Sequence, residues 1–120
     1  MTDVGIRALA TALNTNTHVR ELRLEGNPFG SDGAAALGAA LEGNDVLTRL
    51  TIGMAKVGPD GATAIAKGLR HNRVLRKLEM NACAIGDRGM VEIAVALRSN
   101  AHLEELHLID NTIRVSRDDG

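Results

Sequence analysis

Residues 19–29 read VRELRLEGNPF, and the spacing of their apolar residues recurs three more times along the chain. Leu22 and Leu24 alternate with charged residues, which is the period of two that is typical of a strand with one buried face. The pair returns at each step of 28 residues, as Leu50/Ile52, Leu78/Met80 and Leu106/Leu108. A fixed period in the twenties predicts a solenoid in which each unit packs only against its neighbours.

The other half of each repeat has the spacing of a helix. Residues 33–41 place apolar side chains at i, i+3, i+4 and i+7 or i+8. Small residues recur at positions 10, 38, 66 and 94 and at 12, 40, 68 and 96, so neighbouring helices can approach closely. We expect helices near residues 4–14, 32–43, 60–71 and 88–99, and strands near residues 20–24, 48–52, 76–80 and 104–108.

Polar residues mark both ends of the predicted helices. Asp3, Ser31 and Asp87 each lie two residues before a repeat glycine, where we expect a side-chain oxygen to cap the first turn. Pro59 takes that place in the third repeat and suits the first turn of a helix. Asparagine recurs at the other end, at 16, 44, 72 and 100, and we expect it there in the left-handed cap conformation.

The composition favours one small domain in the cytoplasm. The chain has 120 residues and a net charge of −1, so no overall field attracts nucleic acid or an anionic membrane. Cys83 is the only cysteine, which excludes an internal disulfide. The apolar segment from Val4 to Leu13 contains Arg7, matches the later helices and is too short to span a membrane, so we interpret it as structure and not as a targeting signal.

Polar side chains occupy the strand positions that the core leaves free. Parallel strands lie about 4.8 Å apart, so residues in the same register form rows across the sheet. The first row is Glu21, Arg49, Lys77 and Glu105, in which opposite charges are adjacent at both ends. The second row is Arg23, Thr51, Glu79 and His107. The residues that follow it, Glu25, Gly53, Asn81 and Ile109, complete the polar strip. The strip is either a recognition surface for a protein partner or a solubilising surface with weak ion pairs of about 0–1 kcal/mol each.

A basic run follows the third predicted helix and is a second candidate site. It comprises Lys67, Arg70, Arg73 and Arg76, together with His71 and Lys77. Such a run can bind an acidic protein surface or phosphate groups. It contains no aromatic residue on which a nucleic-acid base could stack. The alternative is a solvated helix end, where the helix dipole favours cations.

Residues with catalytic potential do not form a recognisable constellation. Cys83 is expected inside a turn as a buried thiol, and the four histidines do not converge on one point. Glu104 and Glu105 are expected on opposite faces of a strand, which argues against an acid/base pair. We therefore expect a protein that is not an enzyme and that uses no cofactor, metal or nucleic acid.

The spacing L-x-x-L-x-L-x-x-N/C-x-L, present in four copies over residues 3 to about 113, resembles the signature of leucine-rich repeats. The resemblance implies an α/β solenoid of four 28-residue units, with a parallel sheet inside an arc and helices outside. The repeats would form one domain, residues 1–113, followed by a polar tail at residues 114–120.

Within leucine-rich repeats, a 28-residue unit with a true helix resembles the ribonuclease-inhibitor-like class. The constant step, and the segment ALATALNTNTHV at residues 8–19, look most like the C-terminal domains of tropomodulin and leiomodin. That resemblance implies association with the pointed end of actin filaments. The alternative is a regulatory module of the NOD-like receptor or Ran GTPase-activating-protein type.

The repeat register stops at Arg117, where a fifth repeat glycine would fall. Residues 114–120 are too short and polar for a closing helix, so Leu106, Leu108 and Ile113 would lack a cover. Three outcomes stay open: a self-associating end, a shortened chain, or a marginally stable monomer. Of these, we hypothesise end-to-end dimerisation through the last strand.

Overall fold

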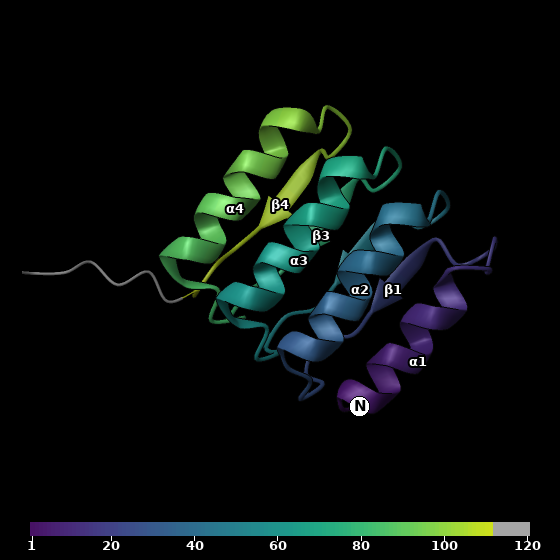
Figure 1. Cartoon of the computed structure of the whole chain (residues 1–120), viewed down its shortest axis with the longest axis horizontal. Coiled ribbons are helices and arrows are strands. Elements are labelled where there is room, and N and C mark those ends of the chain that lie inside the picture. Colours follow the sequence, from purple (N-terminus) through teal and green to yellow (C-terminus); the bar gives the residue numbers. More distant parts are fainter. Residues whose placement is uncertain (112–120) are drawn as a thin grey trace, which may run out of the picture.

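The computed structural model of the protein describes residues 1–111, which form four helix–strand units stacked side by side (Figure 1). The elements alternate along the chain as α1 (Asp3–Leu13), β1 (Glu21–Arg23), α2 (Ser31–Gly43), β2 (Arg49–Thr51), α3 (Gly58–His71), β3 (Lys77–Glu79), α4 (Gly86–Ser99) and β4 (Glu105–His107). Each predicted helix and strand is present. The predicted tail at 114–120, Ile113 and the register stop at Arg117 lie outside the described residues.

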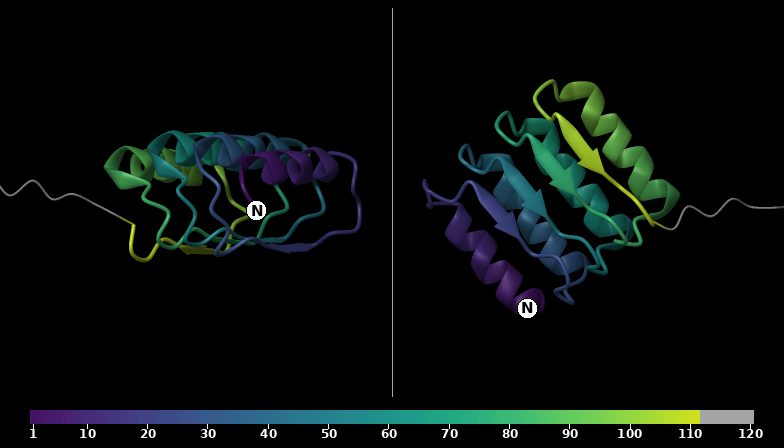
Figure 2. Two further views of the ribbon diagram at one scale, coloured as in Figure 1. Left: turned by 90° about the horizontal axis from the view of Figure 1, so that it is seen from below. Right: turned by 180° about the vertical axis from the view of Figure 1, so that it is seen from behind.

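The four strands form one parallel sheet in the order β1-β2-β3-β4. Leu22 pairs with Leu50, Leu50 with Leu78 and Leu78 with Leu106, so neighbouring strands are offset by one 28-residue step. All four helices cover one face of the sheet, and the other face is open (Figure 2). The α/β solenoid that the repeat predicts is therefore confirmed.

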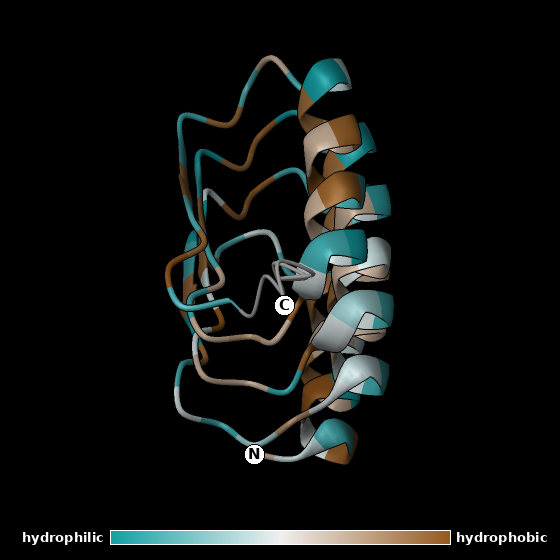
Figure 3. Ribbon diagram, turned by 90° about the vertical axis from the view of Figure 1, so that its left-hand side faces the viewer, coloured by the Kyte–Doolittle hydropathy of each residue, from teal (hydrophilic) through white to brown (hydrophobic). Residues whose placement is uncertain are grey.

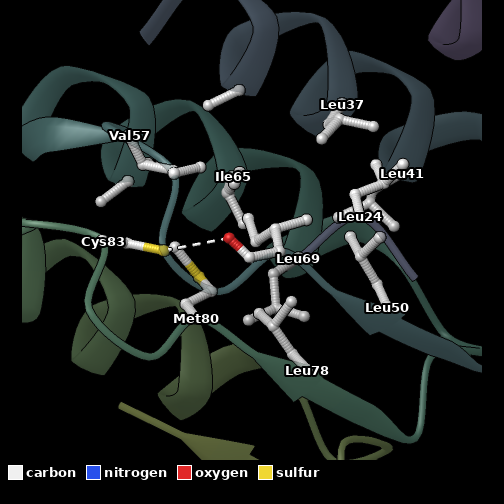
Figure 4. Close-up of a cluster of buried hydrophobic side chains, with 14 of the residues drawn as sticks. Leu24, Leu37, Leu41, Leu50, Val57, Ile65, Leu69, Leu78, Met80 and Cys83 are labelled. Atoms are coloured by element: carbon white, nitrogen blue, oxygen red, sulfur yellow. Dashed lines mark hydrogen bonds between the residues drawn. The ribbon is translucent and has the colours of Figure 1, made fainter. Parts of the chain in front are cut away.

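The core lies between the helix layer and the strand layer, which Figure 3 shows from the side. Ile65 and Leu69 of α3 and Leu50 and Leu78 of the central strands are fully buried there. They gather in one cluster, part of which is drawn in Figure 4. Each such side chain stabilises the fold by about 1.5–3 kcal/mol. The inner strand positions predicted from the period of two are thus core positions.

Small residues bring α2 and α3 into backbone contact. A Cβ atom on Gly68 would overlap the carbonyl oxygen of Gly38, and a Cβ atom on Gly38 would overlap the carbonyl oxygen of Ala64. No larger residue fits at either glycine without a shift of a helix. The prediction that small residues permit close helix packing is confirmed here.

The predicted helix caps at Asp3, Ser31 and Asp87 are wrong. In none of the four helices does the N-cap residue cap the first turn with its own side chain, and Asp3, Ser31 and Asp87 lie within their helices, past the capping position. Asp3 instead serves the next repeat. Its Oδ1 accepts hydrogen bonds from the backbone N–H of Gly30 (2.9 Å) and of Gly33 (2.7 Å) at the start of α2.

The asparagines that follow the helices are not left-handed, which corrects a second expectation. Asn44, Asn72 and Asn100 have extended backbones, and Asn16 lies beyond the C-cap of α1, which is Asn14. Their side chains instead form hydrogen bonds to the backbone. Asn72 Oδ1 accepts from the N–H of residues 74 and 75, and its Nδ2 donates to the carbonyls of residues 41 and 44 in the previous repeat.

A left-handed residue follows every strand. Gly26, Met54, Ala82 and Asp110 have φ of 80°, 63°, 54° and 59° at equivalent places. Only the first is glycine, so periodicity of residue type does not reveal this turn. Gly58 and Gly86 are also left-handed, at 68° and 64°, and α3 and α4 begin there, two residues earlier than expected.

Candidate functional site

The polar rows predicted for the open face of the sheet are present in the predicted register. In the strand register, Arg49 lies beside Glu21 on one side and beside Lys77 on the other, and Lys77 lies beside Glu105. The second row, Arg23, Thr51, Glu79 and His107, follows two residues along the strands. Their use as a binding surface stays a prediction.

Among residues 1–111, an ion pair between two members of the first row forms at only one end of the row. Lys77 Nζ lies 3.9 Å from Glu105 Oε2, across two strands. At the other end, Glu21 Oε2 pairs with Arg23 Nε of its own strand at 3.1 Å. Within residues 1–111, Arg49 therefore has no ion-pair partner, although Glu21 stands next to it in the sheet.

A hollow of about 320 Å³ opens where the strands begin. It is lined by Arg49, Arg76, Lys77, Glu104 and Glu105. Arg76 Nε lies 3.4 Å from Glu104 Oε2, and both side chains are exposed. The expectation that Glu104 and Glu105 face opposite ways is wrong, because β4 begins at Glu105 and the alternation of a strand does not extend to Glu104.

The structure divides the basic run between two places. Lys67 and Arg70 are exposed on α3, and Arg73 is exposed in the loop that follows. Arg76 instead turns to the hollow, where its guanidinium also donates to the carbonyl of His102 at 3.2 Å. The hollow therefore brings together three cations, Arg49, Arg76 and Lys77, that come from two repeats.

Internal hydrogen bonds occupy part of the polar strip. Asn81 Nδ2 donates to Glu79 Oε1 at 3.2 Å, and its Oδ1 accepts from the N–H of Ile109 at 2.7 Å. His107 Nε2 lies 3.5 Å from Glu105 Oε2. Glu25 is exposed at the far end of the strip. Among the predicted strip residues, Arg49 and Glu25 are thus the charged side chains without an internal partner in the described chain.

Cys83 is buried under the sheet and does not face the polar strip. Its thiol donates a hydrogen bond to the carbonyl oxygen of Ile52 at 3.2 Å (Figure 4). Burial raises the pKa of the Cys83 thiol above its ordinary value, because desolvation penalises the thiolate.

In the part of the chain that the structure covers, no three His, Cys, Asp or Glu side chains are grouped to hold a metal ion. No helix there is long and apolar enough to cross a bilayer.

Sequence reasoning missed Glu104 as a lining residue and the grouping of Arg76 with Arg49. The available signal was the repeat itself, since Arg76 and Glu104 hold the same place in successive repeats as Arg20 and Thr48. Residues that precede a strand lie beside one another in the same way as residues within it. The rows could therefore have been extended by one position.

The comparisons with known proteins agree with this architecture. The family model described as "Leucine Rich repeat" matches residues 15–38 and 71–94. No curated protein matches the sequence. Among solved structures, a chain titled "Leiomodin-1 Actin-Binding Site 2 (ABS2)" is similar with a TM-score of 0.84 and 23% identity, over 99% of this chain and 67% of that one. Together with the four stacked units, these matches show that the chain is a leucine-rich repeat protein that resembles the leiomodin domain in its fold.

Proposed function

We propose that the chain is a non-enzymatic protein-interaction module that binds actin and slows subunit exchange at the pointed end of filaments. The observation that carries this proposal is the likeness of nearly the whole chain to a solved domain whose title names an actin-binding site. Such a module would act in the cytoplasm.

The open face of the sheet is the first surface that we assign to the partner. It offers exposed charges on short strands, and its side chains lie in rows because of the parallel register. The exposed cations of α3 and its loop, Lys67, Arg70 and Arg73, form a second surface that suits an acidic partner.

Pyrene-labelled actin filaments with capped barbed ends test the proposal directly. Saturating protein should slow depolymerisation, because only the pointed ends are free to lose subunits. An unchanged rate at saturation would remove the pointed-end function. Co-sedimentation with filaments is the companion measurement, since binding along the sides would appear there without a change in the depolymerisation rate.

We also propose that two copies associate through the β4 edge. In the fourth repeat Leu97 is 37% exposed, whereas the equivalent Leu69 is fully buried. An antiparallel pairing of two β4 strands about Leu106 would place Glu105 opposite His107 of the second copy. A head-to-tail stack would instead place Glu105 beside Glu21, a repulsive pair. The two-fold arrangement is therefore the one that we expect.

Sedimentation velocity over a range of concentrations tests the association. The wild-type chain should form dimers, and Leu106→Lys should be monomeric at the same concentration. Leu22→Lys is the matched control, since Leu22 is the partly buried residue at the same position of the first strand. A monomeric wild type at high concentration would contradict this proposal without affecting the actin assay.

A further inference from the structure

The first polar row has a definite order of charge across the sheet. Reading from β1 to β4, Glu21, Arg49, Lys77 and Glu105 give the order minus, plus, plus, minus. The two cations are adjacent in the register, and the hollow opens beside them. A complementary surface must therefore present the order plus, minus, minus, plus.

The central cations are available to a partner. Arg49 has no carboxylate within ion-pair distance among residues 1–111, and Lys77 reaches Glu105 only at 3.9 Å. The Lys77 and Glu105 side chains are exposed by 34% and 59%, so their ion pair is weak and easily exchanged. An incoming carboxylate can form a bidentate pair with the Arg49 guanidinium at little cost.

The spacing of the row distinguishes between partner conformations. Four strands about 4.8 Å apart place the outer charges roughly 14 Å from each other. Residues i, i+4, i+7 and i+11 of an α-helix lie on one face and span about 16 Å. Four alternate residues of an extended chain span roughly 20 Å. A helix therefore matches the row better, with an error of about 2 Å against about 6 Å.

We infer that the open face of the sheet binds an α-helix of a partner protein, which crosses the strands and carries basic, acidic, acidic and basic residues at i, i+4, i+7 and i+11. The two acidic side chains seat between Arg49 and Lys77, above the hollow. This inference rests on the proposal that the open face binds protein, and it adds the conformation and charge order of the bound segment.

Two alanine-based helical peptides of identical composition test the inference. One carries lysine, glutamate, glutamate and lysine at the four positions, and the other carries glutamate, lysine, lysine and glutamate. Each is titrated into nitrogen-15-labelled protein at low ionic strength, and amide shifts of Arg49 and Lys77 are followed. The first peptide should bind at least about tenfold more tightly. Equal affinities, or the opposite preference, would overturn the inference.

Charge reversal in the protein and in the peptide locates the surface that binds the peptide. Arg49→Glu should weaken the first peptide about tenfold, and a peptide with lysine in place of one central glutamate should regain the loss. Arg98→Glu is the matched control, because Arg98 is exposed on α4, in the helix layer, and belongs to neither proposed binding surface. If Arg98→Glu weakens binding as much as Arg49→Glu, the peptide does not bind specifically to the open face of the sheet and the inference is wrong. Circular dichroism establishes that both variants are folded.

The outcome is separable from that of the actin assay. Charge-ordered peptide binding with no effect on actin would support the helix site and remove the pointed-end function. Actin binding that is insensitive to Arg49→Glu, with no preference between the peptides, would support the actin function and remove the helix site.

Discussion

Asn72 illustrates how a single side chain joins two repeats. It is 3% exposed, and its amide makes four hydrogen bonds, two within its own loop and two to carbonyls of the previous repeat. Asn16 has the same place in the first repeat but is exposed, and only its Oδ1 is bonded, to the N–H of residues 18 and 19. The same residue type therefore has a different energetic role at the two positions.

Replacement of asparagine by aspartate at positions 72 and 16 separates the inter-repeat role of the side chain from its role within the loop. Asn72→Asp keeps the acceptor but removes the donor, and it buries a negative charge against two carbonyl oxygens. We expect a loss of at least about 3 kcal/mol in the free energy of unfolding. Asn16→Asp should change it by less than about 0.5 kcal/mol. Urea denaturation measures both, and similar losses for the two variants would contradict the inter-repeat role.

Cys83 should make stability depend on pH in the alkaline range. Its thiol pKa is raised in the folded state by burial, so folding favours the protonated thiol. That contribution is complete below the pKa of the unfolded thiol and declines as pH rises through it towards the folded pKa. Relative to Cys83→Ala, the wild type should lose stability in urea denaturation as the pH rises above about 8.5, the pKa of an unperturbed thiol.

Cys83→Ala is a mild reference because Ala55 occupies the same place in the second repeat and is buried there. A stability difference between the two proteins that is constant over that pH range would show that the thiol does not ionise on unfolding. Native Cys83 should also react slowly with thiol reagents at neutral pH, since the thiolate is the nucleophile.

At the scale of elements, the contact of α2 with α3 is the least tolerant of change. Gly68→Ala forces a Cβ atom against the Gly38 carbonyl, and the helices must move apart. We expect a loss of at least about 1–3 kcal/mol. Gly43→Ala is the control, since a Cβ atom there meets nothing within 4 Å. It should be neutral or stabilise by up to about 1 kcal/mol. Thermal unfolding of both variants tests this, and equal shifts would contradict it.

The elements and their register could be predicted from the sequence, because each apolar pair such as Leu50/Ile52 has one orientation that buries it. The hydrogen bonds that Asp3 accepts from the next repeat could not be predicted in this way. Its partners Gly30 and Gly33 belong to the next repeat, and a capping rule that considers one helix at a time does not include them. The choice of Glu21 to pair with Arg23 instead of Arg49 depends on side-chain conformation, which periodicity does not specify.

For the whole molecule, burial falls from the middle of the stack towards its ends. Leu50 and Leu78 are fully buried, whereas the equivalent Leu22 and Leu106 are only partly buried. In a solenoid the stability of each unit comes from its neighbours, and the outer units have one neighbour each. Amide exchange should therefore be slowest in α2, β2, α3 and β3. Hydrogen–deuterium exchange read by mass spectrometry would contradict this if all four strands exchanged at one rate.

The constant offset between strands implies that the length of this protein is adjustable only in whole units. Removal of residues 45–72 would bring Asn44 directly before residue 73, in the place that Asn72 holds now, and would pair Leu22 with Leu78. A cut one residue shorter or longer would turn every later inner leucine towards water. The shortened protein would keep its architecture but lose Arg49, so that its first row would read minus, plus, minus. Recombination between repeats would thus rewrite the charge sequence of the sheet while it leaves the fold unchanged.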